Sequence, residues 1–342
     1  MRYVNLGNSG VKVSRVGLGM MTFGNPAWRA WLLDEDAARP IVRRAVELGI
    51  NFFDTADMYS AGMSEEITGK LVREFCPRDE AVIATKVHHP LDLSFSGGST
   101  VGNKPVARPN MGGQSRKRIF AAIDGSLRRL GVDYVDLYQL HRYDPGTPIE
   151  EVMEALHDVV KAGKARYIGA SSMWTWQFAK MQFVAQARGW TRFTAMQNHY
   201  NLVYREEERE MIPFCRDQGI GLTPYSPLAR GFLAGNRRRD DKSAGGAGRD
   251  AADEMAHAYY YQDADFAVVE AVRGVAAARG VSNATVAYAW MLARPGITAP
   301  IVGASKVWQI EEAVGALDVA LTADEMAALE APYQPHRVLG HA

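Results

Sequence analysis

The chain has 342 residues, and its 39 basic and 39 acidic side chains give a formal net charge of zero. This balance argues against a general nucleic-acid or membrane-surface binder, and the moderate glycine and proline content argues against disordered and fibrous classes. Cys76 and Cys215 both fall in predicted helices, which indicates buried thiols in a reducing compartment. The N-terminal residues resemble no signal peptide and no run is long enough to span a bilayer, so we expect a cytoplasmic protein.

Strand-like and helix-like segments alternate along most of the chain. Residues 3–6 and 11–13 flank a turn at 8–10 and predict a small β-hairpin. From Val16 onward the alternation has the spacing of βα units. The predicted strands are 16–19, 51–54, 81–86, 134–141, 165–170, 194–198, 221–225 and 299–302. The predicted helices are 36–48, 65–75, 116–130, 149–161, 174–188, 206–218, 265–279 and 307–316.

These βα units predict an α/β fold, a (β/α)8 TIM barrel, with the whole of residues 1–342 in one domain. The hairpin is an N-terminal cap on this barrel. Two extra helices are predicted at 284–293 and 322–330, the second beginning with a capping box at Thr322 and Glu325. Three stretches fit no unit and are predicted to be loops at the carboxyl edge of the sheet: 22–33, 91–115 and 228–263.

Four ionisable side chains are predicted to share that carboxyl edge. An apolar run ends in Asp54, and Tyr59 follows on a polar loop. Lys86 ends the next predicted strand and His141 ends the one after it. One such group at a strand end is more often structural than catalytic. Four of them at the ends of three successive strands indicate a catalytic site, because ligands of parallel α/β barrels bind at this edge.

The types of these four residues favour proton transfer to an oxygen. A phenol titrates at about pH 10 in water, and a neighbouring ammonium favours the phenolate and so eases proton donation. Lys86 is the candidate ammonium, Asp54 would hold it, and His141 could bond the substrate oxygen. A carbonyl oxygen needs a proton when hydride attacks its carbon. None of these side chains supplies hydride, so the chemistry requires a reduced nicotinamide.

The same residues resemble the catalytic tetrad of the aldo-keto reductases. Asp54 and Tyr59 stand in Asp-Thr-Ala-Asp-Met-Tyr, Lys86 in Ala-Thr-Lys, and His141 in Asp-Leu-Tyr-Gln-Leu-His. The similarity continues in order through 164–172, 196–198, 223–231 and 300–305. The resemblance implies a (β/α)8 barrel with an N-terminal hairpin and two extra helices, an NADPH/NADP+ cofactor and a small-molecule carbonyl substrate. The sequence is most similar in pattern to a microbial branch of the family that is known only as general reductases.

The resemblance also implies which residues bind the cofactor. Tyr225 matches the ring that stacks on the nicotinamide, and Ser171 and Gln197 match the groups that hold its carboxamide. Lys306, a cation at a helix start, suits a 2′-phosphate. The full set is Gly19, Met20, Met21, Asp54, Ser171, Gln197, Tyr225, Ser226, Leu228, Arg230, Gly231, Gly303, Ser305, Lys306, Gln309 and Glu312.

The chain departs from the family at two positions, since Ser172 and Ala313 stand where many members have Asn. Trp28 and Trp31, in the first predicted loop, are assigned to the substrate pocket. His88-His89 lacks the spacing of metal ligands on one face, so we predict a solvated loop and no metal site there.

The leading hypothesis is NADPH-dependent reduction of aldehydes or ketones to alcohols, with Tyr59 as the general acid and bulky xenobiotic or natural-product carbonyls among the candidate substrates. Two alternatives stay open. One is an NADPH-binding, redox-sensing regulatory subunit with little turnover. The other is a barrel aldolase in which Lys86 forms a Schiff base.

Overall fold

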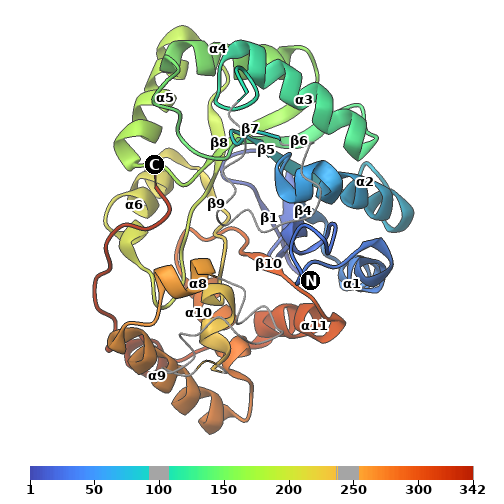
Figure 1. Ribbon diagram of the computed structural model, residues 1–342. Helices are drawn as coiled ribbons and strands as arrows, with labels where there is room; N and C mark the ends of the chain where they lie inside the picture. Colours follow the sequence, from blue (N-terminus) through green and yellow to red (C-terminus); the bar gives the residue numbers. More distant parts are fainter. Residues whose placement is uncertain (92–107, 236, 238–253, 342) are drawn as a thin grey trace.

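The computed structural model describes residues 1–91, 108–235, 237 and 254–341. Eight parallel strands form one curled sheet in the order β10-β3-β4-β5-β6-β7-β8-β9, and helices surround it (Figure 1). This arrangement confirms the predicted (β/α)8 fold. The strands are β3 (Gly17–Gly19), β4 (Phe52–Asp54), β5 (Val82–Val87), β6 (Val135–Leu140), β7 (Ala165–Ser171), β8 (Phe193–Gln197), β9 (Gly221–Leu222) and β10 (Ile301–Gly303).

Isolated bridges, rather than a continuous ladder, join β9 to β10. Leu222 is bridged to Ile297 and Tyr225 to Ile301, and the N–H of Ile301 donates to the carbonyl of Pro224 at 2.8 Å. The predicted strand 221–225 ends early because proline has no N–H with which to continue a ladder. These bridges nevertheless bring the two edge strands together and complete the ring.

The outer layer consists of α1 (Glu35–Glu47), α2 (Met63–Phe75), α3 (Arg116–Leu130), α4 (Ile149–Lys161), α5 (Thr175–Arg188), α6 (Met211–Gln218), α9 (Asp263–Arg279) and α11 (Val307–Gly315). The predicted extra helices are confirmed as α10 (Asn283–Ala293) and α12 (Ala323–Glu330). Short 3-10 helices are η1 (Met20–Thr22), η2 (Tyr59–Gly62), η3 (Glu206–Glu208), η4 (Ala229–Ala234) and η5 (Ala316–Asp318). Among the described helices, none combines the length and apolar composition needed to cross a bilayer.

Two predicted segments differ from the structure. The helix expected at 206–218 is interrupted: η3 comes first, and α6 begins at Met211. This start places Pro213 in the first turn, where its missing N–H costs no helical hydrogen bond. The stretch 228–263 is not all loop, because it contains η4 and the helix α8 (Glu254–Tyr259). Residues 236 and 238–253 of that stretch, and 92–107 of the predicted loop 91–115, lie outside the described part of the chain.

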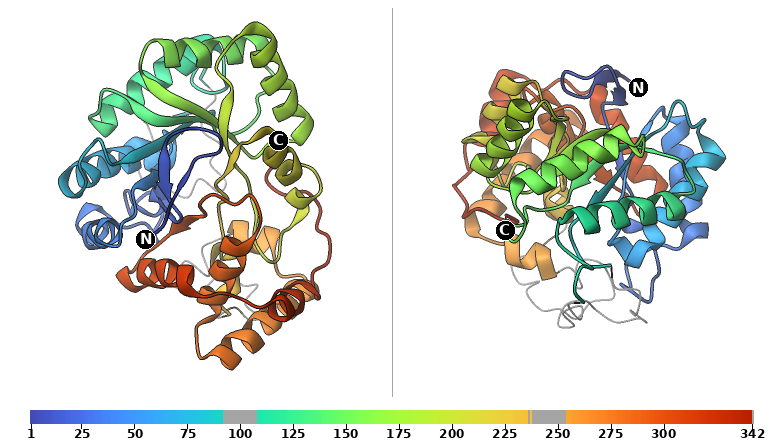
Figure 2. Two further views of the ribbon diagram at one scale, coloured as in Figure 1. Left: turned by 180° about the vertical axis from the view of Figure 1, so that it is seen from behind. Right: turned by 90° about the horizontal axis from the view of Figure 1, so that it is seen from above.

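The N-terminal hairpin closes one end of the barrel, as the side view in Figure 2 shows. Its strands β1 (Tyr3–Asn5) and β2 (Lys12–Ser14) are antiparallel. Leu6 and Val13 of the hairpin join an apolar cluster with inward-facing residues of the barrel strands, including Phe52 and Leu137. The hairpin therefore covers the end of the barrel opposite to the carboxyl ends of its strands.

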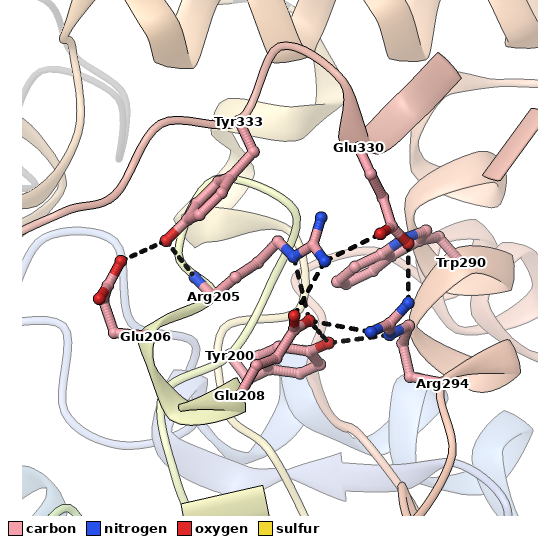
Figure 3. Close-up of polar contacts among 8 residues, drawn as sticks. All are labelled: Tyr200, Arg205, Glu206, Glu208, Trp290, Arg294, Glu330 and Tyr333. Atoms are coloured by element: carbon pink, nitrogen blue, oxygen red, sulfur yellow. Dashed lines mark hydrogen bonds and ion pairs between the residues drawn. The ribbon is translucent and has the colours of Figure 1, made fainter. Parts of the chain in front are cut away.

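Two arginines join α10, α12 and η3 through ion pairs (Figure 3). Arg205 and Arg294 each pair with both Glu208 and Glu330, at N···O distances of 2.8 to 3.2 Å. Tyr333, just after α12, adds a 2.5 Å hydrogen bond from its hydroxyl to Glu206. The C-terminal segment is thus anchored to the turn that follows β8. Partly buried networks of this kind stabilise more than isolated surface pairs do.

We predict opposite effects for two glycine-to-alanine substitutions in helices. A Cβ at Gly69 in α2 would lie 1.9 Å from the carbonyl oxygen of Leu130 in α3, so Gly69→Ala must push the two helices apart. Gly274, exposed in α9, has no atom within 4 Å of such a Cβ. Gly69→Ala should lower the free energy of unfolding by about 1–3 kcal/mol or more. Gly274→Ala should raise it by up to about 1 kcal/mol, because alanine favours helix. Urea unfolding of both variants measures these free energies. Equal changes in the two variants would contradict the prediction.

Candidate active site

Four side chains named from the sequence lie together at one mouth of the barrel. Asp54 is the last residue of β4, Lys86 lies one residue before the end of β5, and His141 directly follows β6. These strands are parallel, with Lys86 in register with Gln139, so their carboxyl ends open on the same side. Tyr59 begins η2, in the loop after β4. The structure therefore brings together all four groups.

Lys86 and Asp54 form a buried ion pair. Nζ of Lys86 lies 2.5 Å from Oδ1 of Asp54 and donates a second bond, of 2.7 Å, to the carbonyl of Thr55. Oδ2 of Asp54 accepts bonds from the side-chain amides of Gln139 at 3.0 Å and Gln197 at 2.8 Å. Neither charged side chain is more than 3% exposed. Protein donors and acceptors, rather than solvent, hold the pair in one geometry.

Tyr59 lies against both Lys86 and His141. Nζ of Lys86 is 5.1 Å from the centroid of the phenol ring, and the ring of His141 meets that ring edge-on at 5.6 Å. Burial alone would lower the pKa of Lys86, but Asp54 and Tyr59 outweigh it and raise that pKa, so Lys86 is a cation at neutral pH. Burial, and next the charge of Lys86, lower the pKa of His141 well below its usual value. Its imidazole is therefore neutral and can donate one hydrogen bond to a ligand oxygen.

The turn that carries Tyr59 has an unusual backbone. Ser60 and Ala61 have φ angles of 49° and 53°, in the left-handed region that residues with a Cβ rarely adopt. The hydroxyl of Ser60 accepts a 2.8 Å bond from the N–H of Asn25, which ties the turn to the segment after β3. Strained backbone of this kind persists where the surrounding structure must aim a functional side chain.

A second buried ion pair lies beside this turn. Nη2 of Arg118 is 2.6 Å from Oδ2 of Asp57, and their side chains are 6% and 1% exposed. Arg118 belongs to α3 and also donates, at 3.3 Å, to the carbonyl of His89. Burial raises the pKa of Asp57 to about 7, although Arg118 acts in the opposite direction. The pair fastens the loop before Tyr59 to α3. Sequence did not indicate it, because its partners are 61 residues apart.

His88 and His89 lie in a loop after β5, as predicted, but this loop is packed against the site rather than solvated. Both are half-buried. The ring of His89 packs edge-on against His141 at 5.0 Å, and His88 packs against His89 at 4.9 Å. Burial, and next the charge of His88, lower the pKa of His89 to about 3, so it is neutral at pH 7. Among the described residues, no group of three or more His, Cys, Asp or Glu is arranged to hold a metal ion.

Three residues that the resemblance assigns to the nicotinamide lie at the same mouth. Ser171 ends β7, Gln197 ends β8 and Tyr225 follows β9. The amide of Gln197 already bonds Asp54. Ser172, at one of the two positions that depart from the family, donates a 3.1 Å hydrogen bond from its hydroxyl to the hydroxyl of Tyr225. The serine thus positions the tyrosine ring, a function that sequence did not reveal.

The other residues assigned to the cofactor lie in three segments at this edge. Gln309 is already bonded within the chain, since its side chain caps α11 by accepting two main-chain N–H bonds at 2.7 and 3.1 Å. Glu312 accepts a bond from Ser282. The segments comprise Gly19, Met20 and Met21 after β3, then Ser226, Leu228, Arg230 and Gly231 after β9, and Gly303, Ser305, Lys306, Gln309 and Glu312 at β10 and α11.

Trp28 and Trp31 lie in the segment after β3 that contacts the turn of Tyr59 through Asn25. Trp28 is buried and Trp31 half-buried, and the guanidinium of Arg29 lies 4.8 and 5.7 Å from the two ring centroids. Their assignment to the substrate pocket stays a prediction.

The raised pKa of Asp57 predicts a pH-dependent stability. In an unfolded chain an aspartate titrates at about 3.9, whereas Asp57 titrates at about 7 in the folded protein. Between these values the folded state holds the extra proton, so the contribution of Asp57 to stability falls as pH rises through 7. An asparagine does not titrate. The difference in free energy of unfolding between Asp57→Asn and the natural protein should therefore shift in favour of the variant by about 1–3 kcal/mol as the pH is raised from about 5 to about 8.

Urea unfolding at several pH values measures this difference. Asp318→Asn is the matched control, because its carboxylate is 86% exposed. If the free energy of unfolding of the natural protein instead rises relative to that of Asp57→Asn as the pH increases, the charge of Arg118 outweighs burial in setting the pKa of Asp57. The raised pKa assigned to Asp57 would then be wrong.

Comparison with known proteins agrees with this architecture. The profile of the aldo/keto reductase family matches residues 15–334. An aldo-keto reductase of Fusarium vanettenii is 44% identical, over 99% of this chain and 93% of its own. The versiconal hemiacetal acetate reductase of Aspergillus parasiticus is also 44% identical, over 99% and 98%. A candidate aryl-alcohol dehydrogenase of Schizosaccharomyces pombe is 43% identical, over 99% and 97%. The chain is a member of the aldo/keto reductase family, and with it an oxidoreductase.

Proposed function

We propose that this protein, as a single catalytic domain, reduces aldehydes and ketones to alcohols with NADPH, and that Tyr59 is the general acid. One observation carries the proposal: the phenol of Tyr59 lies at the open mouth of the barrel against a buried, charged Lys86 and a neutral His141. Family membership supports carbonyl reduction as the class of reaction.

Each of the four side chains has one role in the proposed mechanism. When bound, the reduced nicotinamide would supply hydride to the carbonyl carbon. The oxygen then gains negative charge, and the hydroxyl of Tyr59 gives it a proton, so that an alcohol forms. The positive charge of Lys86 stabilises the phenolate that remains on Tyr59. Asp54 holds Lys86 in place through the 2.5 Å ion pair, and the neutral His141 orients the carbonyl oxygen by a hydrogen bond.

The residues around the mouth suit a dinucleotide. Both amide atoms of Asn198 and the hydroxyl of Thr223 are buried there without a hydrogen-bond partner in the described part of the chain, and a buried polar group normally has one. Ser226 and Arg230 have φ angles of 55° and 59°, a backbone that can turn main-chain amides toward a phosphate. We assign the nicotinamide to the mouth near Tyr225 and the adenosine end to the start of α11.

The aldolase alternative fits the geometry poorly. Schiff-base formation needs a neutral amine, whereas Lys86 is charged and bonded to Asp54 and Thr55. The sensor alternative shares the whole binding site and differs only in turnover.

The first test is Tyr59→Phe. We expect carbonyl reduction, followed as loss of NADPH absorbance with a panel of aldehydes and ketones, to fall roughly 10²–10⁴-fold because the proton donor is gone. The dissociation constant of NADPH should stay the same. Tyr3→Phe, an exposed tyrosine at the closed end of the barrel, is the control. Retained reduction would remove Tyr59 from this role, and tight NADPH binding without turnover by the natural protein would favour the sensor.

The second test concerns the choice of NADPH over NADH. Lys306 is exposed at the N-cap of α11, where its ammonium and the helix N-terminus can both attract the 2′-phosphate. Lys306→Met should raise the KM for NADPH by roughly tenfold or more and leave the KM for NADH nearly unchanged. Lys306→Arg keeps the charge and should keep the preference. If Lys306→Met changes the KM for NADPH and the KM for NADH equally, Lys306 does not bind the 2′-phosphate.

A further inference from the structure

Arg142 is a cation of the mouth to which the proposed mechanism gives no role. It follows His141 at the carboxyl end of β6 and is half-buried. One Nη1–H donates to the carbonyl of His141 at 2.8 Å, and no hydrogen bond from the guanidinium to another acceptor is found among the residues that the structure describes. Within that same part of the chain, Arg142 forms no ion pair with any carboxylate. Most of its donors therefore remain for a ligand.

The carboxylate closest to Arg142 in the sequence is already satisfied by neutral donors. Asp144 accepts bonds from the N–H of Gln114 at 2.8 Å, the N–H of Gly146 at 2.9 Å and the hydroxyl of Thr147 at 2.7 Å. The side chain of Gln114 in turn bonds the carbonyl of Arg142. These contacts fix the backbone that carries Arg142 without neutralising its charge.

The charge of Arg142 acts across the whole mouth. Burial lowers the pKa values of imidazoles at four positions and raises that of a phenol, and in each case the positive charge of Arg142 acts to lower the pKa further or to oppose its rise. These groups come from four different strand ends. The affected groups are His88 and His89 after β5, His141 after β6, His199 after β8, and Tyr225 after β9.

Other cations pair with two of the carboxylates at the mouth. Asp54 is paired with Lys86, and Asp57 with Arg118. The nearby imidazoles are neutral, because burial lowers their pKa values. Oε1 of Glu207, which also acts on Tyr225, lies 3.0 Å from Nε2 of His341. Asp144 is also ionised, because its hydrogen bonds outweigh burial and lower its pKa, but no ion pair joins it to Arg142 in the described part of the chain. The guanidinium of Arg142 therefore keeps its unused donors for a ligand.

We propose that Arg142 binds an anionic oxygen group of the substrate, so that this protein prefers carbonyl compounds that also carry a carboxylate. The guanidinium is a planar fork that matches the two oxygens of a carboxylate. The side chain of Arg142 is half-buried, which weakens the screening of this attraction by solvent. Tyr143 and Trp176, with ring centroids 6.2 Å apart, make the adjoining rim aromatic, and this suits a benzoate-type acid. The inference rests on the proposed reductase function.

The competing explanation is structural. Arg142 could serve only to hold the carbonyl of His141, which would keep the imidazole in place for every substrate. A structural residue would affect neutral and acidic substrates alike. An anion-binding residue affects the acidic ones alone, so matched substrates separate the two.

The experiment compares ortho-, meta- and para-carboxybenzaldehyde with their methyl esters, in which the negative charge is absent. For the natural protein, kcat/KM should be roughly tenfold or more higher for at least one acid than for its ester. Arg142→Met should remove that preference through a higher KM, while the esters change by less than about threefold. Arg142→Lys should keep part of the preference for the acids. Arg116→Met, which breaks an exposed ion pair between Arg116 of α3 and Asp158 of α4, is the control and should change neither kcat/KM.

The outcomes decide between the two explanations. Equal kcat/KM for acid and ester in the natural protein, or an equal loss for both in Arg142→Met, overturns the inference. If the natural protein reduces none of these aldehydes, the reductase proposal fails for this substrate class. Calorimetric binding of benzoate and of benzamide to the protein with NADP+ then tests Arg142 by itself. Benzoate binding that Arg142→Met abolishes supports the inference, and benzoate binding no tighter than that of benzamide overturns it.

Discussion

The rest of the site depends on the ion pair between Lys86 and Asp54. A lysine with no exposed surface would lose its proton unless a negative charge compensated for burial. Asp54 supplies that charge, and the amides of Gln139 and Gln197 satisfy its second oxygen. The pair thus keeps a fixed positive charge beneath Tyr59 at neutral pH. Removing either partner would leave the other as an uncompensated buried charge, which is costly in free energy.

Burial has the opposite consequence for the histidines. In the described part of the chain no ion pair joins His141 or His89 to a carboxylate, and burial keeps both imidazoles neutral. These imidazoles are therefore uncharged hydrogen-bonding groups beside the cation of Lys86. Such a site can stabilise negative charge as it develops on an oxygen, without first paying to reorganise water. Arg142 adds a second positive charge at the rim, where a distant part of a substrate can reach it.

The precision of the site comes from elements that lie outside it. The hairpin closes the far end of the barrel, and the bridges between β9 and β10 complete the ring. The strained turn is held on both sides of Tyr59. Before it, Asp57 pairs with Arg118, and after it, Ser60 accepts a hydrogen bond from the N–H of Asn25. Ser172 holds Tyr225 by a hydroxyl bond. Each of these contacts joins segments that are far apart in sequence, so the loops at the mouth are fixed by the packing of the barrel.

Local sequence patterns were enough to predict the alternation of strands and helices, the barrel, and the edge at which Asp54, Lys86 and His141 meet. These features follow from local periodicity and from the rule that parallel strands share one carboxyl edge. The same patterns misjudged the histidine pair after β5 and the start of α6, and they did not show the partners of Asp57 or Ser172. Side-chain direction, burial and the compensation of charge decided those points. They depend on contacts between distant segments, and only the tertiary structure brings such segments together.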